Sequence, residues 1–320
     1  MEHQRLGISY LSGLISNAQA KSVEPIALEF LGQDSVRSLQ RFLKNFKWDH
    51  EAMLLSHQRL LSEQISDDDG MINTDSSEFI KKGKESVGVA RQYCGERGKV
   101  ENCQSGVFVG YSSTKGYGLL NGCLYMPESW FSQENEKRRK DNWVPEDLTF
   151  KTKPEIALEL VKQVTSTGLY PAKWFGCDAT FGSNIKFLEA LPDEMNYFAQ
   201  IKSSTRIFTR KPKMIMPEYK GQGPRPQKMK IAPGQTKARK VSQIAQSQRI
   251  NWMPVIVAES SKGPITAEVA RLRIFLSRDG LPEGKEQWFF MRKNSDGQIK
   301  YAISNAPRCI WCRLFGIYGG

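Results

Sequence analysis

The N-terminal part of the chain carries apolar residues at helical spacing. Two series of such positions occur: Val36, Leu39, Phe42, Leu43 and Phe46, and then Leu54, Leu55, Leu61 and Ile65. Spacings of three and four residues put each series on one face of a helix. Asp34 or Ser35 suits the N-cap of the first helix, and Asp49 that of the second. The pattern predicts an N-terminal helical region over residues 1–69.

The other faces of the first helix are basic, with Arg37, Arg41, Lys44 and Lys47. These side chains either contact DNA phosphates or form an ordinary solvated face, because cations on a helix surface serve both purposes. The pattern alone leaves both interpretations open.

The periodicity changes after a turn that residues 67–70 (DDDG) predict. Short or alternating apolar runs predict strands at residues 71–75, 87–93, 107–111, 119–125, 173–177 and 197–201. Helices are expected from Lys153, where Pro154 suits the first turn, and over residues 184–191. Antiparallel-capable strands followed by helix, strand, helix and strand match the ribonuclease H-like α/β layout. We expect the first part of such a catalytic core over residues 70–201.

Residues 202–240 are strongly basic and rich in proline and glycine, with Glu218 as their one acid. This composition predicts an extended, partly disordered arm. Its expected DNA-contacting residues are Lys202, Arg206, Arg210, Lys211, Lys213, Lys220, Arg225, Lys228 and Lys230. Few aromatic residues interrupt them, which favours phosphate contact over base stacking; a linker that binds nothing is the alternative. Strands are expected again at residues 255–257, 271–276 and 288–292, so residues 202–307 form a basic, β-containing insertion.

Composition narrows the class of partner. The chain has 320 residues, is 39% hydrophobic and carries a formal net charge of +12. An excess of this size favours a polyanion such as nucleic acid, although a merely basic or ribosome-associated protein would share it. No apolar run approaches the roughly 18 residues that span a bilayer, and the N-terminus lacks a signal-peptide pattern. We expect a cytoplasmic protein without a membrane partner.

Histidine and cysteine usage excludes several chemistries. The three histidines (His3, His50 and His57) all precede the predicted sheet, which argues against Ser-His-Asp and Cys-His hydrolases. Six scattered cysteines suit a reduced chain without disulfides. The one CxxC, at Cys309 and Cys312, lacks the second ligand pair that a zinc site requires. Carboxylates with metal ions remain as the expected chemistry.

Two aspartates stand where such chemistry would lie. Asp75 closes the first predicted strand, and Asp178 closes the strand after the long helix. In a ribonuclease H-like sheet these two strands are neighbours, so both carboxylates reach one edge. Two Mg²⁺ or Mn²⁺ ions about 4 Å apart serve phosphodiester transfer, and carboxylate oxygens are their preferred ligands. The alternative is that each aspartate is a turn or cap residue.

Several long segments resemble one family of proteins. They are residues 75–95 (DSSEFIKKGKESVGVARQYCG), 98–107 (GKVENCQSGV), 125–130 (YMPESW), 144–147 (VPED), 150–155 (FKTKPE) and 176–182 (GCDATFG). In this order they resemble the transposases of insertion sequence family 701. The resemblance runs from residues 22–27 (SVEPIA) to 301–307 (YAISNAP), nearly the whole chain.

The resemblance implies a DDE-type transposase of a bacterial insertion sequence. It implies metal-dependent cleavage and strand transfer at the ends of the element, with element ends and target DNA as partners and a homo-oligomer in the synaptic complex. Asp75 takes the place of the first acid and Asp178 that of the second. Many relatives carry a further Asp where this chain has Ser76. Lys81, Lys82 and Lys84 follow Asp75 closely and are expected to hold DNA phosphates or to be solvated.

The C-terminus departs from the family pattern. Relatives place the third acid, a glutamate, on a helix after the SNAP segment, whereas this chain continues with residues 308–320 (RCIWCRLFGIYGG). We interpret these as an aberrant tail that leaves out the last catalytic helix, and expect impaired cleavage. Glu268 and Glu286 lie in expected strands and do not replace the missing acid. An inactive, truncated DNA-binding remnant is the alternative function, and an RNA-associated basic protein is a third.

Overall fold

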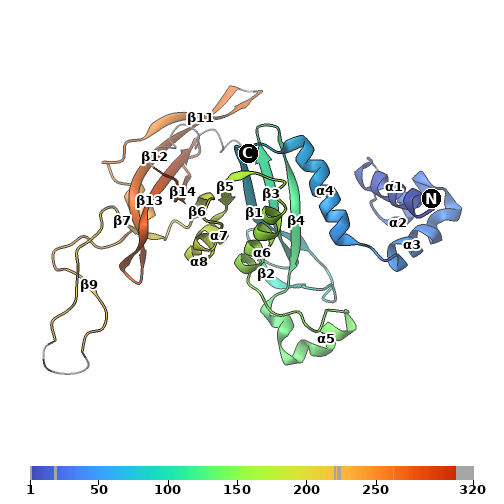
Figure 1. Ribbon diagram of the computed structural model, residues 1–320, viewed down its shortest axis with the longest axis horizontal. Coiled ribbons are helices and arrows are strands. Elements are labelled where there is room, and N and C mark those ends of the chain that lie inside the picture. The colour runs from blue at the N-terminus through green and yellow to red at the C-terminus, as the bar shows by residue number, and fades with distance from the viewer. Residues whose placement is uncertain (1, 18–19, 220, 222–224, 262, 308–320) are drawn as a thin grey trace. The chain divides into compact units, whose positions relative to one another are not determined.

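The computed structural model describes residues 2–17, 20–219, 221, 225–261 and 263–307. The chain divides into two compact units, Met1–Ser56 and His57–Gly320. The first unit is helical, and the second is built on a large mixed sheet (Figure 1). The tail at 308–320, its two cysteines and the interpretation placed on it lie outside the described residues.

The two helices predicted from apolar spacing are confirmed as α3 (Val36–Asn45) and α4 (His50–Ile65), which continues into the second unit. The N-terminal region also contains α1 (Glu2–Ile15), α2 (Val23–Phe30) and the short η1 (Gln33–Ser35). Leu6, Ile26, Ala27, Leu39 and Phe42 form the buried core of the first unit. Leu39 and Phe42 belong to the apolar series that predicted α3, so the periodicity located the buried face correctly.

One of the two predicted caps is present. Asp49 Oδ1 accepts a hydrogen bond from Ala52 N at 2.9 Å, which satisfies a free donor at the start of α4. Ser35 occupies the N-cap position of α3 but makes no side-chain cap bond. Its hydroxyl instead donates to Leu31 O at 3.3 Å, because η1 turns the chain back toward the end of α2. The prediction that Asp34 or Ser35 caps α3 by a side-chain bond is therefore wrong.

A sheet of twelve strands forms the centre of the second unit. Its strands are β1 (Gly70–Ile80), β2 (Ala90–Cys94), β3 (Lys99–Ser113), β4 (Gly116–Tyr125), β5 (Ala172–Cys177), β6 (Asn196–Ile201), β7 (Arg206–Phe208), β10 (Arg239–Lys240), β11 (Met253–Ser260), β12 (Gly263–Arg278), β13 (Leu281–Asn294) and β14 (Ile299–Ser304). The order is β10-β7-β12-β13-β14-β6-β5-β1-β3-β2, with β11 on β12 and β4 on β3. β1, β5 and β6 run parallel, and the other pairs are antiparallel.

Helices cover one face of this sheet. The helices of the second unit are η2 (Glu128–Phe131), η3 (Gln133–Asn135), α5 (Glu136–Asp141), α6 (Lys153–Ser166), α7 (Ala179–Gly182), α8 (Ile185–Glu189) and α9 (Val241–Ala245). α6 starts with a Thr152–Glu155 capping box and buries Ile156, Leu160 and Val164 in the main core with β1 and β3. Figure 1 shows α6 lying along these strands. A smaller apolar cluster, centred on Trp174, Phe198 and Phe290, occupies the opposite face of β5, β6 and β13.

The predicted order of strands and helices is confirmed, but several boundaries differ. β1 was expected to end at Asp75, yet it continues to Ile80 because residues 76–80 keep their antiparallel pairing with β3. Pairing of β1 with β5, by contrast, stops at Thr74 opposite Cys177. Asp75 is therefore the first β1 residue without a β5 partner, inside a strand rather than at its end. The expected helix over 184–191 is shorter, α8, and α7 precedes it.

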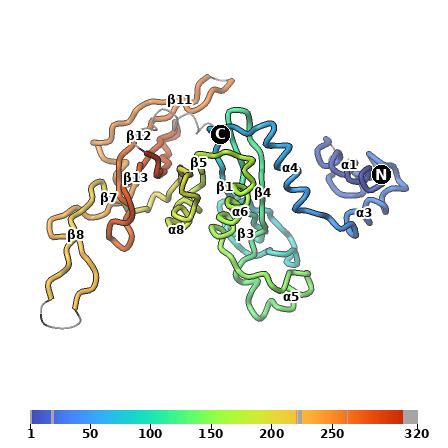
Figure 2. Tube along the Cα trace, in the orientation of Figure 1, coloured from blue at the N-terminus to red at the C-terminus, as the bar shows by residue number. Residues whose placement is uncertain are grey.

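The basic segment is more ordered than its composition predicts. Residues 206–208 form β7, which pairs with both β10 and β12, and Ile207 and Phe208 are buried. β8 (Met214–Ile215) and β9 (Lys230–Ile231) form a separate antiparallel pair. Figure 2 follows the chain away from β7 through β8 and back to the sheet. Ile207 and Phe208, two adjacent apolar residues among many cations, hold the start of the segment in the sheet. The average composition of the segment does not reveal so short an apolar pair.

Candidate active site

Asp75 and Asp178 lie on neighbouring parallel strands at the same edge of their pairing. Thr74 is opposite Cys177; Asp75 is the next residue of β1, and Asp178 directly follows the end of β5. Neighbouring strands are about 4.8 Å apart, so the two backbones run side by side at this point. The negative charge of Asp178 acts on the carboxyl of Asp75, which places the two side chains within electrostatic reach of each other. The sheet brings both predicted acids to one edge.

Asp178 is held rigidly by the first turn of α7. Its Oδ1 accepts hydrogen bonds from Thr180 N at 2.9 Å and Phe181 N at 3.3 Å, and Oδ2 accepts one from the Thr180 hydroxyl at 2.8 Å. The cap interpretation is therefore correct for this residue. It does not exclude a metal role, because an ionised carboxylate has about four lone-pair sites. The contacts to Thr180 and Phe181 fix the direction in which the remaining lone pairs point.

The carboxyl of Asp75 is harder to ionise than an ordinary aspartate. Its side chain reaches solvent, but partial desolvation is the largest influence and raises its pKa above the usual 3.8. A hydrogen bond from Ser76 N to Oδ1 at 2.7 Å opposes this rise, and the charges of Asp178 and Glu78 add to it. A carboxyl whose ionisation is disfavoured by a neighbouring carboxylate forms a natural position for a cation, which removes the repulsion.

A buried ion pair lies on the α6 side of the same strand. Lys153 Nζ, at the start of α6, is 3.1 Å from Glu78 Oε1, and the two side chains are 19% and 8% exposed. The same oxygen accepts from the hydroxyl of Ser105 at 3.0 Å, and Oε2 accepts from Gly95 N at 3.2 Å. Glu78 thus joins β1, β3, α6 and the end of β2. Sequence reasoning missed both residues, although Glu78 stands in the DSSE motif and Lys153 in FKTKPE.

Glu78 is ionised despite its burial. Desolvation is the largest single influence and raises its pKa, but the hydrogen bond and charge of Lys153, with the donors of Gly95 and Ser105, together bring the pKa below its usual 4.5. A buried carboxylate of this kind depends on its partner. The pair fixes β1 immediately beyond Asp75.

The predicted lysines occupy a loop at the far end of β1. Asn102 orders this loop by donating to Lys81 O at 2.7 Å and Gly83 O at 2.9 Å. Lys81 follows Asp75 by six residues of strand, which corresponds to roughly 20 Å at about 3.4 Å per residue. The expectation that these lysines lie close to Asp75 is wrong, because β1 remains extended through Ile80. Lys82 and Lys84 are exposed beside α5.

The described cations that were expected to contact DNA from the basic segment are all exposed, namely Lys202, Arg206, Arg210, Lys211, Lys213, Arg225, Lys228 and Lys230. Lys220 lies outside the described residues. Lys202 directly follows β6, whose partner β5 ends at Cys177, immediately before Asp178, so Lys202 lies at the same edge of the sheet as the two aspartates. The others are distributed over β7, β9 and the connecting segments, where they form a solvated basic surface.

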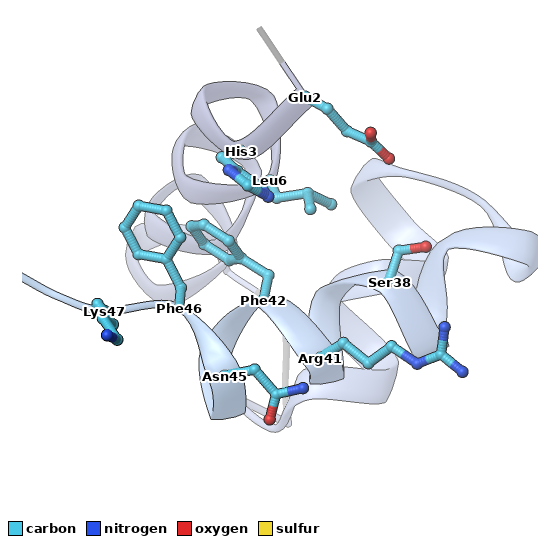
Figure 3. Close-up of a pocket in the computed structure, with 9 residues that line it drawn as sticks. All are labelled: Glu2, His3, Leu6, Ser38, Arg41, Phe42, Asn45, Phe46 and Lys47. Carbon is cyan, nitrogen blue, oxygen red and sulfur yellow. The ribbon is translucent and has the colours of Figure 1, made fainter.

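The N-terminal unit has a separate surface pocket of about 370 Å³ between α1 and α3. Figure 3 shows His3 and Phe42 against one wall and the polar ends of Arg41, Asn45 and Lys47 around it. The His3 ring stacks on Phe42 at 5.8 Å and meets Phe46 edge-on at 5.1 Å. The basic helix face of the sequence therefore borders an aromatic cavity, and both interpretations of that face stay open.

Two other kinds of site are not found in the part of the chain that the structure describes. No group of three or more His, Cys, Asp or Glu side chains is close enough to share a metal ion there. None of the described helices has the length and apolarity needed to cross a membrane. Cys94, Cys103, Cys123 and Cys177 are free thiols.

Comparison with known proteins agrees with the class that the sequence motifs indicate. The chain matches the DDE superfamily endonuclease family over residues 2–264, and it belongs to that family. It is similar to the probable transposase for insertion sequence element IS701 of Microchaete diplosiphon, with 26% identity over 194 residues. That alignment covers 60% of this chain and 47% of the relative, so the chain spans about half the length of this curated relative. The resemblance stated from the sequence is confirmed.

A comparison of folds gives a weaker likeness. The NurA nuclease from Sulfolobus solfataricus aligns with 90% of this chain and 86% of its own, at 9% sequence identity and a TM-score of 0.30. A score this low does not establish a shared fold.

Proposed function

We propose that this chain is a transposase that cuts DNA at the ends of an insertion sequence and joins them to target DNA, using Asp75 and Asp178 to hold a divalent cation. The observation that carries the proposal is the parallel register of β1 and β5, which brings the two carboxylates together at one edge. Membership of the DDE superfamily endonucleases and similarity to an IS701 transposase support it.

The proposal includes a ribonuclease H-like core over residues 70–201. Its support is the antiparallel series β2-β3-β1 followed by parallel β1-β5-β6, with α6 between β4 and β5 along the chain. We keep residues 1–69 as the N-terminal helical region and 202–307 as the basic insertion, although β14 of that insertion pairs with β6 of the core. Because DNA is the proposed partner, we also propose that the protein forms a homo-oligomer on paired element ends. On the same ground we propose that it acts in the cytoplasm, at the nucleoid.

The residues present fit a divalent cation in type. Two carboxylates are the oxygen donors that Mg²⁺ or Mn²⁺ prefers, and the raised pKa of Asp75 is relieved by a cation. When bound, the cation neutralises charge at a phosphodiester oxygen. Thr180 and Phe181 fix the carboxylate of Asp178, so its free lone pairs have a defined direction toward the cation. Lys202 supplies a positive charge at the same edge. The Glu78–Lys153 pair holds the β1 backbone in place.

The second candidate function is DNA binding without cleavage. It is favoured by the number of carboxylates, because the described residues place two acids rather than three at this edge. Glu268 and Glu286 do not add to them: Glu268 pairs with Lys293 at 2.8 Å and Glu286 with Arg273 at 3.1 Å, on β12 and β13. Impaired cleavage belongs to this candidate. An RNA-binding role is the third, supported by charge alone.

A cleavage assay separates these candidates. Purified protein is mixed with labelled DNA that carries an element end, in Mg²⁺ and in Mn²⁺. The transposase proposal predicts strand cutting that falls at least about 100-fold in Asp75→Asn and in Asp178→Asn, because each substitution removes a charge that the cation requires. Asp68→Asn, in the turn at the other end of β1, is the matched control and keeps full cutting.

Other outcomes identify the alternatives. Binding of the end DNA by all variants, with no cutting by any of them, would favour the non-cleaving candidate. Tighter binding of structured RNA than of DNA at equal salt would favour the third.

A further inference from the structure

Trp143 occupies a backbone position that normally belongs to glycine. After α5, Trp143 N donates to Lys140 O at 3.1 Å and Val144 N donates to Arg139 O at 3.0 Å. These two bonds form a Schellman motif, in which the residue after the C-cap must adopt the left-handed conformation. Trp143 does so, with φ of +55°. A side chain in this region is strained by about 1 kcal/mol or more, and glycine is not.

The strained tryptophan gains no burial in return. Its side chain is 92% exposed, whereas the next residue, Val144, is buried beside Trp130 and Val89. Valine therefore supplies the hydrophobic contact that usually accompanies this motif. The backbone strain at Trp143 is therefore not offset by burial of its indole. The exposed indole ring is available for contact with a partner.

The segment that carries Trp143 is firmly mounted. The Arg138 guanidinium lies 3.9 Å from the centre of the Trp130 ring, and Trp130 is fully buried with its Nε1 donating to Val89 O at 2.8 Å. Arg139 donates to the carbonyls of Trp130 and Ser132. Both arginines thus attach α5 to residues 130–132 of the same chain. Trp143 therefore lies at the end of a helix that is held in place by these contacts.

The segments beside Trp143 carry charges of both signs: the loop at residues 81–85 is basic, whereas Asp141, Glu146 and Asp147 lie within four residues of Trp143. α5 (EKRRKD) has four basic and two acidic side chains, and the loop at residues 81–85 (KKGKE) has three and one. Arg138 donates to Lys84 O, so the lysine loop and α5 lie together. Lys82 and Lys84 are exposed there, and Lys140 pairs with the exposed Glu136 on the same helix. An exposed aromatic ring on a segment joined to a loop of exposed lysines can bind a nucleic-acid strand, because the ring stacks on a base while the lysines neutralise phosphates.

We propose that Trp143 stacks on an unpaired base of the DNA substrate while Lys82 and Lys84 contact the adjoining phosphates. The inference rests on the proposed function for its partner, DNA, and adds a preference for DNA with an unpaired end. The lysine loop lies roughly 20 Å from Asp75 along β1, so this contact is separate from the carboxylate pair.

The test measures binding without cleavage. Fluorescence anisotropy of labelled DNA in EDTA compares a duplex with a short unpaired tail and a blunt duplex of the same sequence. Variants of the full chain are Trp143→Gly, which removes both ring and strain, and Trp143→Phe, which keeps a ring. Tyr117→Ala is the control, because Tyr117 is an aromatic residue with similar exposure, 87%, in β4.

Trp143→Gly is expected to weaken binding of the tailed duplex by roughly 5- to 100-fold, the value of one base stack, and to affect the blunt duplex less. Trp143→Phe retains most of the affinity, and Tyr117→Ala retains all of it. Trp143→Gly should unfold at the same or a higher temperature than the wild type, since the strain is gone. Loss of binding with undiminished stability is a result that a structural role does not produce.

Three results would overturn the inference. They are equal binding of tailed DNA by Trp143→Gly and wild type, an equal loss in Tyr117→Ala, and a change in oligomeric state in Trp143→Gly that accounts for the loss. If wild type cuts or binds DNA and Trp143→Gly does so equally well, only this inference fails. If wild type binds no DNA at all, the proposed function fails with it.

Discussion

Gly182→Ala is expected to destabilise the second unit by about 3 kcal/mol, toward the upper end of what overpacking costs. A Cβ at this position would overlap the carbonyl oxygen of Gln200 and lie 3.0 Å from the Cβ of Ala199. The obstacle is the backbone of β6, which cannot rotate away as a side chain does. α7 would have to move off the sheet, and Asp178 at its N-cap would move with it. Urea unfolding followed by circular dichroism measures the loss.

Gly83→Ala is the matched control, because nothing lies within 4 Å of its added Cβ and its φ is not positive. It should leave the unfolding free energy within about 0.5 kcal/mol of the wild type. The account of α7 packing fails if Gly182→Ala is as stable as Gly83→Ala. It also fails if Gly182→Ala is unstable and yet retains metal binding equal to that of the wild type in the folded fraction.

Lys153→Met is the second substitution with a large expected effect. It leaves the Glu78 carboxylate buried without its cation, which costs about 3 kcal/mol near neutral pH. Lys151→Met is the control two residues earlier: Lys151 pairs with Glu159 at 2.8 Å, but the two side chains are about half exposed, so the loss of this pair has little effect on stability. Adding Glu78→Gln to Lys153→Met should recover much of the stability. Equal effects of Lys153→Met and Lys151→Met would contradict the role of the buried pair.

The pH dependence of this effect has a definite sign. In the wild type the pKa of Glu78 is below its usual 4.5, so the pair stabilises the fold above that pH and the stability is lost as pH falls through the lower folded value. Substitution of Lys153 removes two of the influences that lower the pKa of Glu78, so this pKa is expected to rise in the variant. Protonation of the Glu78 carboxyl therefore removes the cost of the unpaired buried charge in the variant. The stability difference between wild type and Lys153→Met should shrink as pH is lowered from 7 toward 4.

Much of the fold followed from local patterns. Apolar spacing located the helices and the core strands, and the placement of Asp75 and Asp178 at one edge required only that their strands be parallel neighbours. The length of β1 was not predictable, because residues 76–80 alternate weakly and stay extended through their pairing with β3. β7 was also missed, since two buried residues, Ile207 and Phe208, stand among cations.

The remaining features of the site depend on contacts between distant segments. Glu78 and Lys153 are separated by 75 residues, and neither carries a sign of its partner in the sequence. The mounting of Trp143 depends on Arg138 reaching both Trp130 and the lysine loop, 54 residues away. Aspartates can be recognised by type and position along a strand. Ion pairs and strained turns are set by three-dimensional packing.

The most direct test of the carboxylate pair is Mn²⁺ binding, followed by electron paramagnetic resonance of the free ion. Wild type should bind Mn²⁺, and Asp75→Asn and Asp178→Asn should each weaken binding at least tenfold, whereas Asp68→Asn should not. Asparagine preserves the cap of α7, so folding is retained in Asp178→Asn. Binding should also weaken as pH falls, because the raised pKa of Asp75 lets protons compete early. Unchanged Mn²⁺ affinity in either site variant would contradict a shared metal site at these two strands.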